Sequence, residues 1–208
     1  IDHVFVAVEP GGGELLRRLD QLGLRPSFRR RHEGQGTENV CYAFDNLYLE
    51  LLWECDAAAL DSAPVAPTRL PQRVRRVGGA CPLGVAVRGG LLSPTWAWQP
   101  TFLPAGMTLE VAELSRDPAM PLLFVSPGTA APIDWTDGRA GDRQRHLGLH
   151  VADVRLRLPA EHTDEAATAL GKACDVVTGD NPGLDLIFGD RLLTITAVGP
   201  DDHRVALT

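Results

Sequence analysis

Residues 1–23 read IDHVFVAVEPGGGELLRRLDQLG, and this stretch indicates how the fold begins. The β-branched run over residues 4–8 predicts a strand that ends before a proline and three glycines. Residues 14–22 follow with four leucines on one helical face, and Gly23 stands where a helix C-cap belongs. The chain therefore opens with a strand and an amphipathic helix.

The residues that follow add three strands to this pair. Alternating or continuous apolar patterns predict strands over residues 24–31, 40–44 and 47–53. An Asp-Asn pair at 45–46 predicts a tight hairpin between the last two. Residues 32–39, HEGQGTEN, read as a polar loop with glycines. Residues 1–54 therefore form a first module with the order β-α-β-β-β.

The rest of the chain divides into two further segments. Residues 55–147 are predicted to be a connection, with at most one helical turn, and an irregular, strand-rich middle module. Its expected strands are 83–87, 99–102, 108–114 and 122–125. Residues 148–208 repeat the opening pattern, with a helix over 164–170 capped by Thr163 and strands at 154–158, 175–178, 184–188 and 191–197. We expect all three segments to pack as one compact unit, because a β-α-β-β-β unit leaves one sheet face uncovered.

Composition excludes several classes of function. The chain has 20 Lys and Arg against 27 Asp and Glu, a net charge of −7, which disfavours nucleic-acid and membrane-surface partners. No apolar run approaches the ~18 residues that a membrane span needs, and residues 1–4 lack the features of a signal peptide. The four cysteines form no CxxC pair, so we expect reduced thiols in a cytoplasmic protein.

Three strings in the first module resemble a known group of proteins. IDHVFVAV at 1–8, HEGQGTEN at 32–39 and YLELLW at 48–53 resemble the vicinal oxygen chelate superfamily, in its glyoxalase-like domain branch. The string WAWQPTFLP at 96–104 also fits that branch. The resemblance implies an α+β fold of repeated β-α-β-β-β modules, with curved mixed sheets around a cavity. It further implies a small-molecule ligand and a homodimer.

Strand alternation predicts where the chemistry would lie. His3 shares a strand face with Phe5, and Glu50 shares a face with Tyr48, so an imidazole and a carboxylate should point to the concave side of the sheet. The resemblance implies that His3 and Glu50 are ligands of a divalent metal ion, Fe, Mn, Ni, Co or Zn. Two other interpretations stay open: a metal-free pocket with a His–Glu hydrogen bond, and an ordinary structural pair.

The ligand set that the resemblance implies is incomplete in this sequence. Aligning the last segment with the first places Asp153 opposite His3 and Thr194 opposite Glu50, and a threonine cannot replace a carboxylate ligand. If the middle segment supplies the partner strands, residues 83–85 offer no histidine or glutamine and residues 122–125 no glutamate. The sequence does not decide which segment completes the cavity.

Four further residues are candidate substrate contacts. His32, Gln35 and Asn39 can form hydrogen bonds to ligand oxygens from a glycine-containing loop that lets the backbone approach closely. The alternative is a β-turn held by local side-chain bonds. Trp53 is a candidate for the apolar wall of the cavity, although most tryptophans are core residues.

Two functions from different classes are therefore expected. The first is a metal-dependent lyase, isomerase or dioxygenase-type enzyme that acts on a small oxygenated molecule, with Glu50 as ligand or as general base. The second is a metal-free protein that binds and sequesters a small molecule in the same cavity. A third, weaker hypothesis is a scaffold whose cavity is filled by its own side chains.

Overall fold

The computed structural model describes residues 1–199 and 202–208, most of which lie in strands and loops, with few helices. One sheet contains β1 (His3–Ala7), β2 (Phe28–His32), β3 (Thr37–Ala43), β4 (Tyr48–Glu54), β5 (Leu83–Val87), β6 (Thr95–Trp98), β7 (Leu109–Ala112) and β8 (Leu122–Val125). The other contains β9 (Asp153–Leu158), β10 (Asp175–Thr178), β11 (Gly183–Phe188), β12 (Arg191–Gly199) and β13 (Asp202–Leu207). The α+β class expected from the sequence is confirmed.

The helices are short. The α-helices are α1 (Gly13–Gln21), α2 (Ala57–Leu60), α3 (Leu70–Arg75) and α4 (Ala160–Leu170). Single 3₁₀ turns are η1 (Pro10–Gly12), η2 (Ala66–Thr68), η3 (Glu113–Arg116), η4 (Pro132–Asp134), η5 (Arg145–Leu147) and η6 (Gly171–Ala173). None of the described helices is long and apolar enough to cross a membrane.

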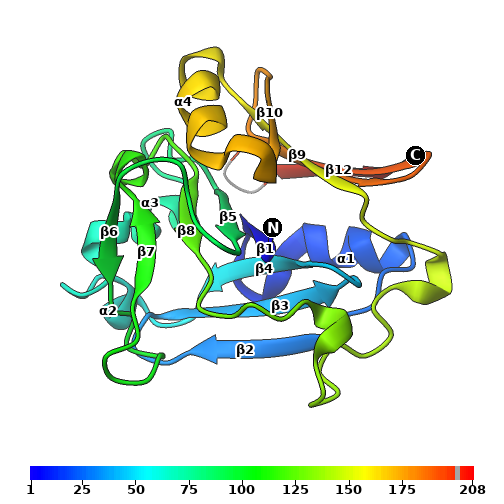
Figure 1. The fold of residues 1–208 in the computed structure, drawn as a ribbon, viewed down its shortest axis with the longest axis horizontal. Coiled ribbons are helices and arrows are strands. Elements are labelled where there is room, and N and C mark those ends of the chain that lie inside the picture. Colours follow the sequence, from blue (N-terminus) through cyan, green and yellow to red (C-terminus); the bar gives the residue numbers. More distant parts are fainter. Residues whose placement is uncertain (200–201) are drawn as a thin grey trace.

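The larger sheet joins the first and middle segments of the chain. Its strand order is β2-β3-β4-β1-β5-β8-β7-β6, with β1 parallel to β4, β5 parallel to β8, and β1 antiparallel to β5. Figure 1 shows β2 to β4 running in a clearly different direction from β6 to β8, so the sheet is strongly curved. The smaller sheet has the order β10-β9-β11-β12-β13. There β9 pairs with β10 and β11. Its counterpart in the first segment, β1, pairs with β4 and β5, so the two segments differ in how their strands pair.

Side-chain alternation along β1 assigns the two faces of the larger sheet. Val4, Val6 and Val8 belong to the main core together with α1 and the smaller sheet. Phe5 and Ala7 belong to a second apolar cluster on the opposite face. This is the period of two that the sequence predicts for a strand with different environments on its two sides.

Helix α4 covers a part of the larger sheet that has no helix from its own segment. No helix occurs between β5 and β6. The backbone N–H of Leu92, in that connection, donates to the carbonyl of Ala169 in α4 at 2.8 Å. Val85, Val87 and Ala166 lie in the same core cluster. The last segment therefore buries apolar surface that the middle segment leaves bare.

A buried arginine stabilises the connection between β4 and β5, which joins the two halves of the larger sheet. Arg73 in α3 is 0% exposed and donates hydrogen bonds to backbone carbonyls only. These carbonyls belong to Thr68, Cys81, Ser115, Asp117, Pro118 and Met120. Arg73 thereby ties α3 to the segment that leads into β8.

Several boundaries differ from those predicted. Strand β3 begins at Thr37 rather than 40, because the expected loop pairs with β2. Strand β6 spans Thr95–Trp98 rather than 99–102. Thr163 does not cap α4 but lies inside it, where its hydroxyl donates to the carbonyl of Pro159 at 3.1 Å. Strand β13 was not predicted.

Candidate functional site

A pocket of about 860 Å³ opens on the face of the larger sheet opposite α1. Its lining residues fall between Asp2 and Arg139, so the first and middle segments build it, and the described residues 148–199 and 202–208 contribute none. Asp153 and Thr194, which the repeat pattern placed opposite His3 and Glu50, are not among its lining residues. The middle segment is therefore the one that completes this pocket.

A smaller pocket of about 490 Å³ lies beside α2 and α3. Its Arg75 is engaged by Glu54 at 2.8 Å and by Asp61 at 2.7 Å. We place the candidate site in the larger pocket, because that pocket contains His3 and Glu50.

His3 and Glu50 meet on the floor of the larger pocket. The parallel register of β1 and β4 sets His3 beside Tyr48 and Phe5 beside Glu50, which puts both polar side chains on one face. His3 Nε2 lies 3.6 Å from Glu50 Oε2, and the two side chains are only 10% and 7% exposed. The His3 ring also stacks on Tyr48, with centroids 4.5 Å apart. The sequence prediction that these side chains point from neighbouring strands to the same face of the sheet is confirmed.

Asp2 orients the imidazole of His3 through Nδ1, the ring nitrogen that does not face Glu50. Asp2 Oδ2 lies 2.8 Å from His3 Nδ1, and Asp2 Oδ1 lies 2.8 Å from the guanidinium of Arg88. Burial alone would raise the pKa of Asp2. The hydrogen bond from His3 and the charges of His3 and Arg88 outweigh burial and hold the pKa of Asp2 below its ordinary value. Because an ionised carboxylate only accepts hydrogen bonds, His3 Nδ1 carries a proton and Nε2 is the atom that faces Glu50.

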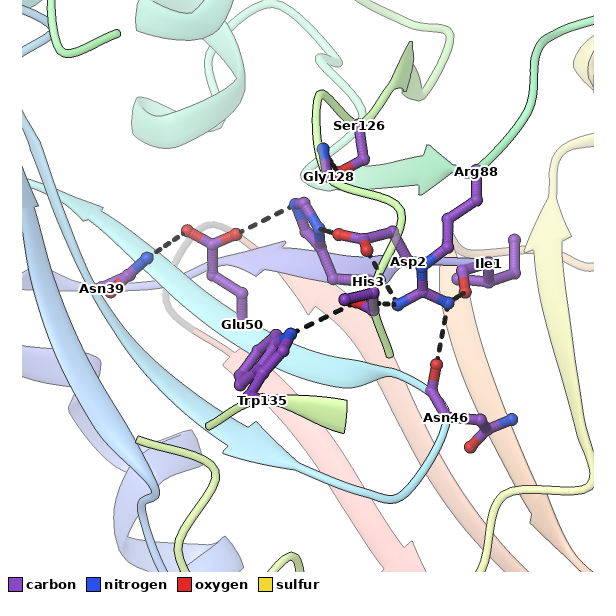
Figure 2. A network of polar contacts seen from close by, with 11 residues as sticks. Ile1, Asp2, His3, Asn39, Asn46, Glu50, Arg88, Ser126, Gly128 and Trp135 are labelled. Carbon is purple, nitrogen blue, oxygen red and sulfur yellow. Dashed lines mark hydrogen bonds and ion pairs between the residues drawn. The ribbon is translucent and has the colours of Figure 1, made fainter. Parts of the chain in front are cut away.

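Figure 2 shows the whole chain of contacts, from Asn39 through Glu50, His3 and Asp2 to Arg88. His3 Nε2 and Glu50 Oε2, at 3.6 Å, lie within ion-pair distance but beyond hydrogen-bond distance. Both groups line the pocket, and Asp2 contacts the other nitrogen of the imidazole, so a bound molecule can meet an imidazole and a carboxylate side by side. This is the arrangement expected of a general acid–base pair.

Asn39 fixes the other carboxylate oxygen. Its side-chain amide donates to Glu50 Oε1 at 2.6 Å, and its Oδ1 accepts the backbone N–H of Arg30 at 2.9 Å. The antiparallel pairing of β3 with β4, with Cys41 opposite Glu50, brings these strands into register. Asn39 lines the pocket, as predicted, and in addition it positions Glu50.

His32 and Gln35 form a second polar group at the pocket wall. His32 Nδ1 lies 2.9 Å from Thr37 Oγ1, which also accepts from the amide of Gln35 at 2.7 Å. Burial is the main cause that lowers the pKa of His32; the charge of Glu50 opposes this shift, and that of Arg30 adds to it. The adjoining turn needs Gly36, whose φ is +80° and where a Cβ would lie 2.3 Å from the carbonyl oxygen of Asp56.

The assignment of Trp53 to the substrate site is wrong in this structure. Trp53 lies in the main core and does not line the pocket. The core position of Trp53 follows from the same alternation that places Glu50 in the pocket, because residues three apart on a strand point to opposite faces. The aromatic wall comes instead from Phe28, Tyr48 and Trp135, whose ring centroids are 5.6 to 5.8 Å apart.

Sequence reasoning also missed Asp2, Arg88 and Trp135. Asp2 had a signal, since it precedes His3 directly. Arg88 and Trp135 lie far along the chain from His3, and no local pattern connects them to it.

The donor set does not fit a resident metal ion. His3 and Glu50 supply two donors, and Asp2 is engaged by Arg88 and by Nδ1 of the His3 ring. Across the sheet, Ala86 pairs with His3, and the Phe124 ring centroid lies 5.5 Å from that of His3. Within residues 1–199 and 202–208, no group of three or more His, Cys, Asp or Glu side chains is placed to hold a metal ion.

We therefore expect little metal to be retained. Purified protein would be loaded in turn with Mn, Fe(II), Co, Ni and Zn, dialysed against metal-free buffer, and its metal content measured beside that of His3→Ala. Both proteins should hold far less than one ion per chain, because two protein donors bind a divalent ion weakly. Near-stoichiometric metal in the wild type that is lost in His3→Ala would contradict this prediction.

Comparison with known proteins gives one match. A family model described as a glyoxalase-like domain matches residues 1–116. The matched region includes β1 to β7 and, with them, His3, Asn39 and Glu50. No curated protein and no solved structure matches the chain.

Proposed function

Because the chain belongs to the glyoxalase-like domain family, we propose that its larger pocket binds a small oxygenated molecule and that the His3–Glu50 pair transfers a proton on it. The observation that carries the proposal is the buried contact of 3.6 Å between His3 Nε2 and Glu50 Oε2 on the pocket floor. A structural ion pair needs no access to a cavity, whereas an acid–base pair does.

The geometry suggests a role for each group in proton abstraction beside a carbonyl. Glu50, as the carboxylate, takes the proton from the acidic C–H; the C–H electron pair moves toward the carbonyl, and charge develops on its oxygen. His3, as the imidazolium, donates from Nε2 to that oxygen. Asp2 stabilises the imidazolium, and Asn39 holds Glu50 through the bond of 2.6 Å. Positioned general acid–base groups of this kind contribute about 10²- to 10⁴-fold in rate.

No step of this proposal passes through a metal ion, since the described donor set does not support one. The metal-dependent version of the hypothesis would need further ligands where Ala86 and Phe124 stand.

A second function, binding without turnover, is favoured by the aromatic wall. Phe28, Tyr48 and Trp135 pack edge-to-face around the pocket and offer a flat ligand a large apolar contact. A protein that only sequesters a compound would need this wall and would have no use for a proton-transfer pair.

Solvent isotope exchange separates the two functions without knowledge of the substrate. The protein would be incubated in D₂O with a metal chelator and a panel of small 2-oxo acids, hydroxyketones and aryl ketones. Proton transfer predicts loss of the α-proton NMR signal of at least one compound, faster than in protein-free buffer. Saturable binding of panel compounds with no exchange in any of them would contradict the proton-transfer function and support sequestration.

A further inference from the structure

The rim of the larger pocket is cationic although the chain carries a net charge of −7. Arg30 and Arg139 both line the pocket. The guanidinium carbon of Arg30 lies 5.2 Å from the ring centroid of Phe102, and that of Arg139 lies 3.9 Å from the ring centroid of Trp135. Stacking of this kind orients the planar fork of an arginine and leaves its N–H edge available to a ligand.

Little within the chain competes for these two charges. Arg139 faces Asp137 at 3.3 Å, but both side chains are about half exposed, and exposed pairs of this kind are weak. No ion pair involves Arg30 in the part of the chain that the structure describes. Its backbone is fixed by Asn39, which also holds Glu50.

Both charges act on the interior of the same pocket. Burial, followed by the charge of Glu50, raises the pKa of the Cys41 thiol, and the charges of Arg30 and Arg139 oppose that rise. Cys41 stands opposite Glu50 in the β3–β4 register, close to the floor. The two guanidinium charges therefore act near the place where a bound molecule would meet Glu50.

The carboxylates of the pocket are already compensated. Asp2 is paired with His3 and Arg88, and Glu50 is paired with His3 and bound by Asn39. Among the described residues, the charges of Arg30 and Arg139 lack a buried counterpart, and Arg29, which also lines the pocket, adds a third positive charge. A pocket with aromatic walls and uncompensated guanidinium groups at its mouth favours an anion carried on a flat molecule.

We propose that the pocket selects an anionic ligand, in which a flat ring bears a carboxylate or a phosphonate-type group held by Arg30 and Arg139. The rest of the molecule reaches inward to the His3–Glu50 pair. This inference rests on the proposed function in one respect, that the larger pocket is the ligand site. It adds the class of ligand and the orientation of the ligand, whose anionic group lies at the rim and whose reacting end lies at the floor.

Matched probes test the anion requirement directly. Ligand-observed NMR titrations would measure the affinity of 1-naphthoate, 1-naphthylphosphonate and the neutral 1-naphthamide for the wild-type protein. We expect at least one anion to bind about tenfold or more tightly than the amide, a preference that falls as salt is added. The better of the two anions identifies the headgroup class.

Variants assign the preference to the rim. Arg30→Gln and Arg139→Gln should each lower the affinity for the preferred anion by about tenfold, with little change for the amide. Arg204→Gln, which alters an exposed arginine of β13 outside the pocket, makes the same change in net charge and should have no effect.

Two outcomes would overturn the proposal. Equal affinities of the wild type for the amide and both anions would refute the anion site while leaving the pocket as a ligand site. An anion preference that survives both rim variants would place the anion elsewhere. Proton transfer is judged separately, by isotope exchange, so failure of the anion site is distinguishable from failure of the proposed reaction.

Discussion

Replacement of Glu50 by glutamine should lower the rate of the isotope exchange proposed above by about 10²- to 10⁴-fold, the contribution of one positioned general base. A glutamine cannot take a proton from carbon, yet its amide oxygen can still accept the hydrogen bond that Asn39 gives to Glu50 Oε1. The fold and the pocket should therefore persist. Exchange rates would be measured by NMR in D₂O, and ligand affinity by titration with the same compound.

Glu38→Gln is the matched control for this variant. Glu38 lies on the neighbouring strand β3, opposite Trp53, and is not part of the pocket lining. It makes the same chemical change without touching the floor, so its exchange rate should equal that of the wild type. Full activity in a folded Glu50→Gln protein would eliminate Glu50 as the base.

The second large effect concerns stability. Arg73→Met should lower the free energy of unfolding by about 3–5 kcal/mol, because it leaves several buried backbone carbonyls without a donor. Burial lowers the pKa of Arg73 to about 10. Because that pKa is below the unfolded value, the buried charge is a cost at neutral pH, and this cost is relieved only as the pH rises through it.

Methionine removes that cost but leaves the backbone carbonyls. Six of them accept from Arg73, and each buried carbonyl left without a donor costs about 1–3 kcal/mol unless water reaches it. The unpaired carbonyls outweigh the relieved charge, so the net effect is destabilising. Urea unfolding followed by circular dichroism would measure it.

Arg75→Met provides the comparison in the same helix. Arg75 binds Glu54 and Asp61 at the surface, where ion pairs contribute at most about 1 kcal/mol. Its unfolding midpoint should stay close to that of the wild type. Equal losses in the two variants would show that the carbonyl cluster around Arg73 is not a special source of stability.

Local patterns predicted much of the fold because they depend on neighbours in the chain. Strands β5 and β8 occur at the residues expected, and the alternation of β1 correctly separated Val4, Val6 and Val8 from the pocket face. The connection after the first module was expected to hold at most one helical turn, whereas it contains α2, η2 and α3, and α3 is held by contacts of Arg73 with carbonyls distant in the chain.

The residues of the candidate site were likewise predictable only where their positions depend on neighbours in the chain. The meeting of His3 with Glu50 followed from strand parity, which is a local property. The positions of Arg88 and Trp135 did not, because they depend on how the middle segment folds back onto the first. Trp53 was misplaced because its residue type suggested a ligand wall, while its place on β4 assigns it to the core.

The reacting groups of the pocket lie on strands and part of its wall lies on a loop, which has an evolutionary consequence. Glu50, His3 and Asn39 stand on paired central strands and contact one another, so a change in one side chain alters the contacts of the others. Trp135 and Arg139 stand on the loop after β8, beyond the region that matches the family model. Mutation of that loop can alter which compound is accepted while the reacting groups stay in place. Divergence in ligand choice among descendants of such a protein should therefore accumulate in residues 126–139 before it touches the strands.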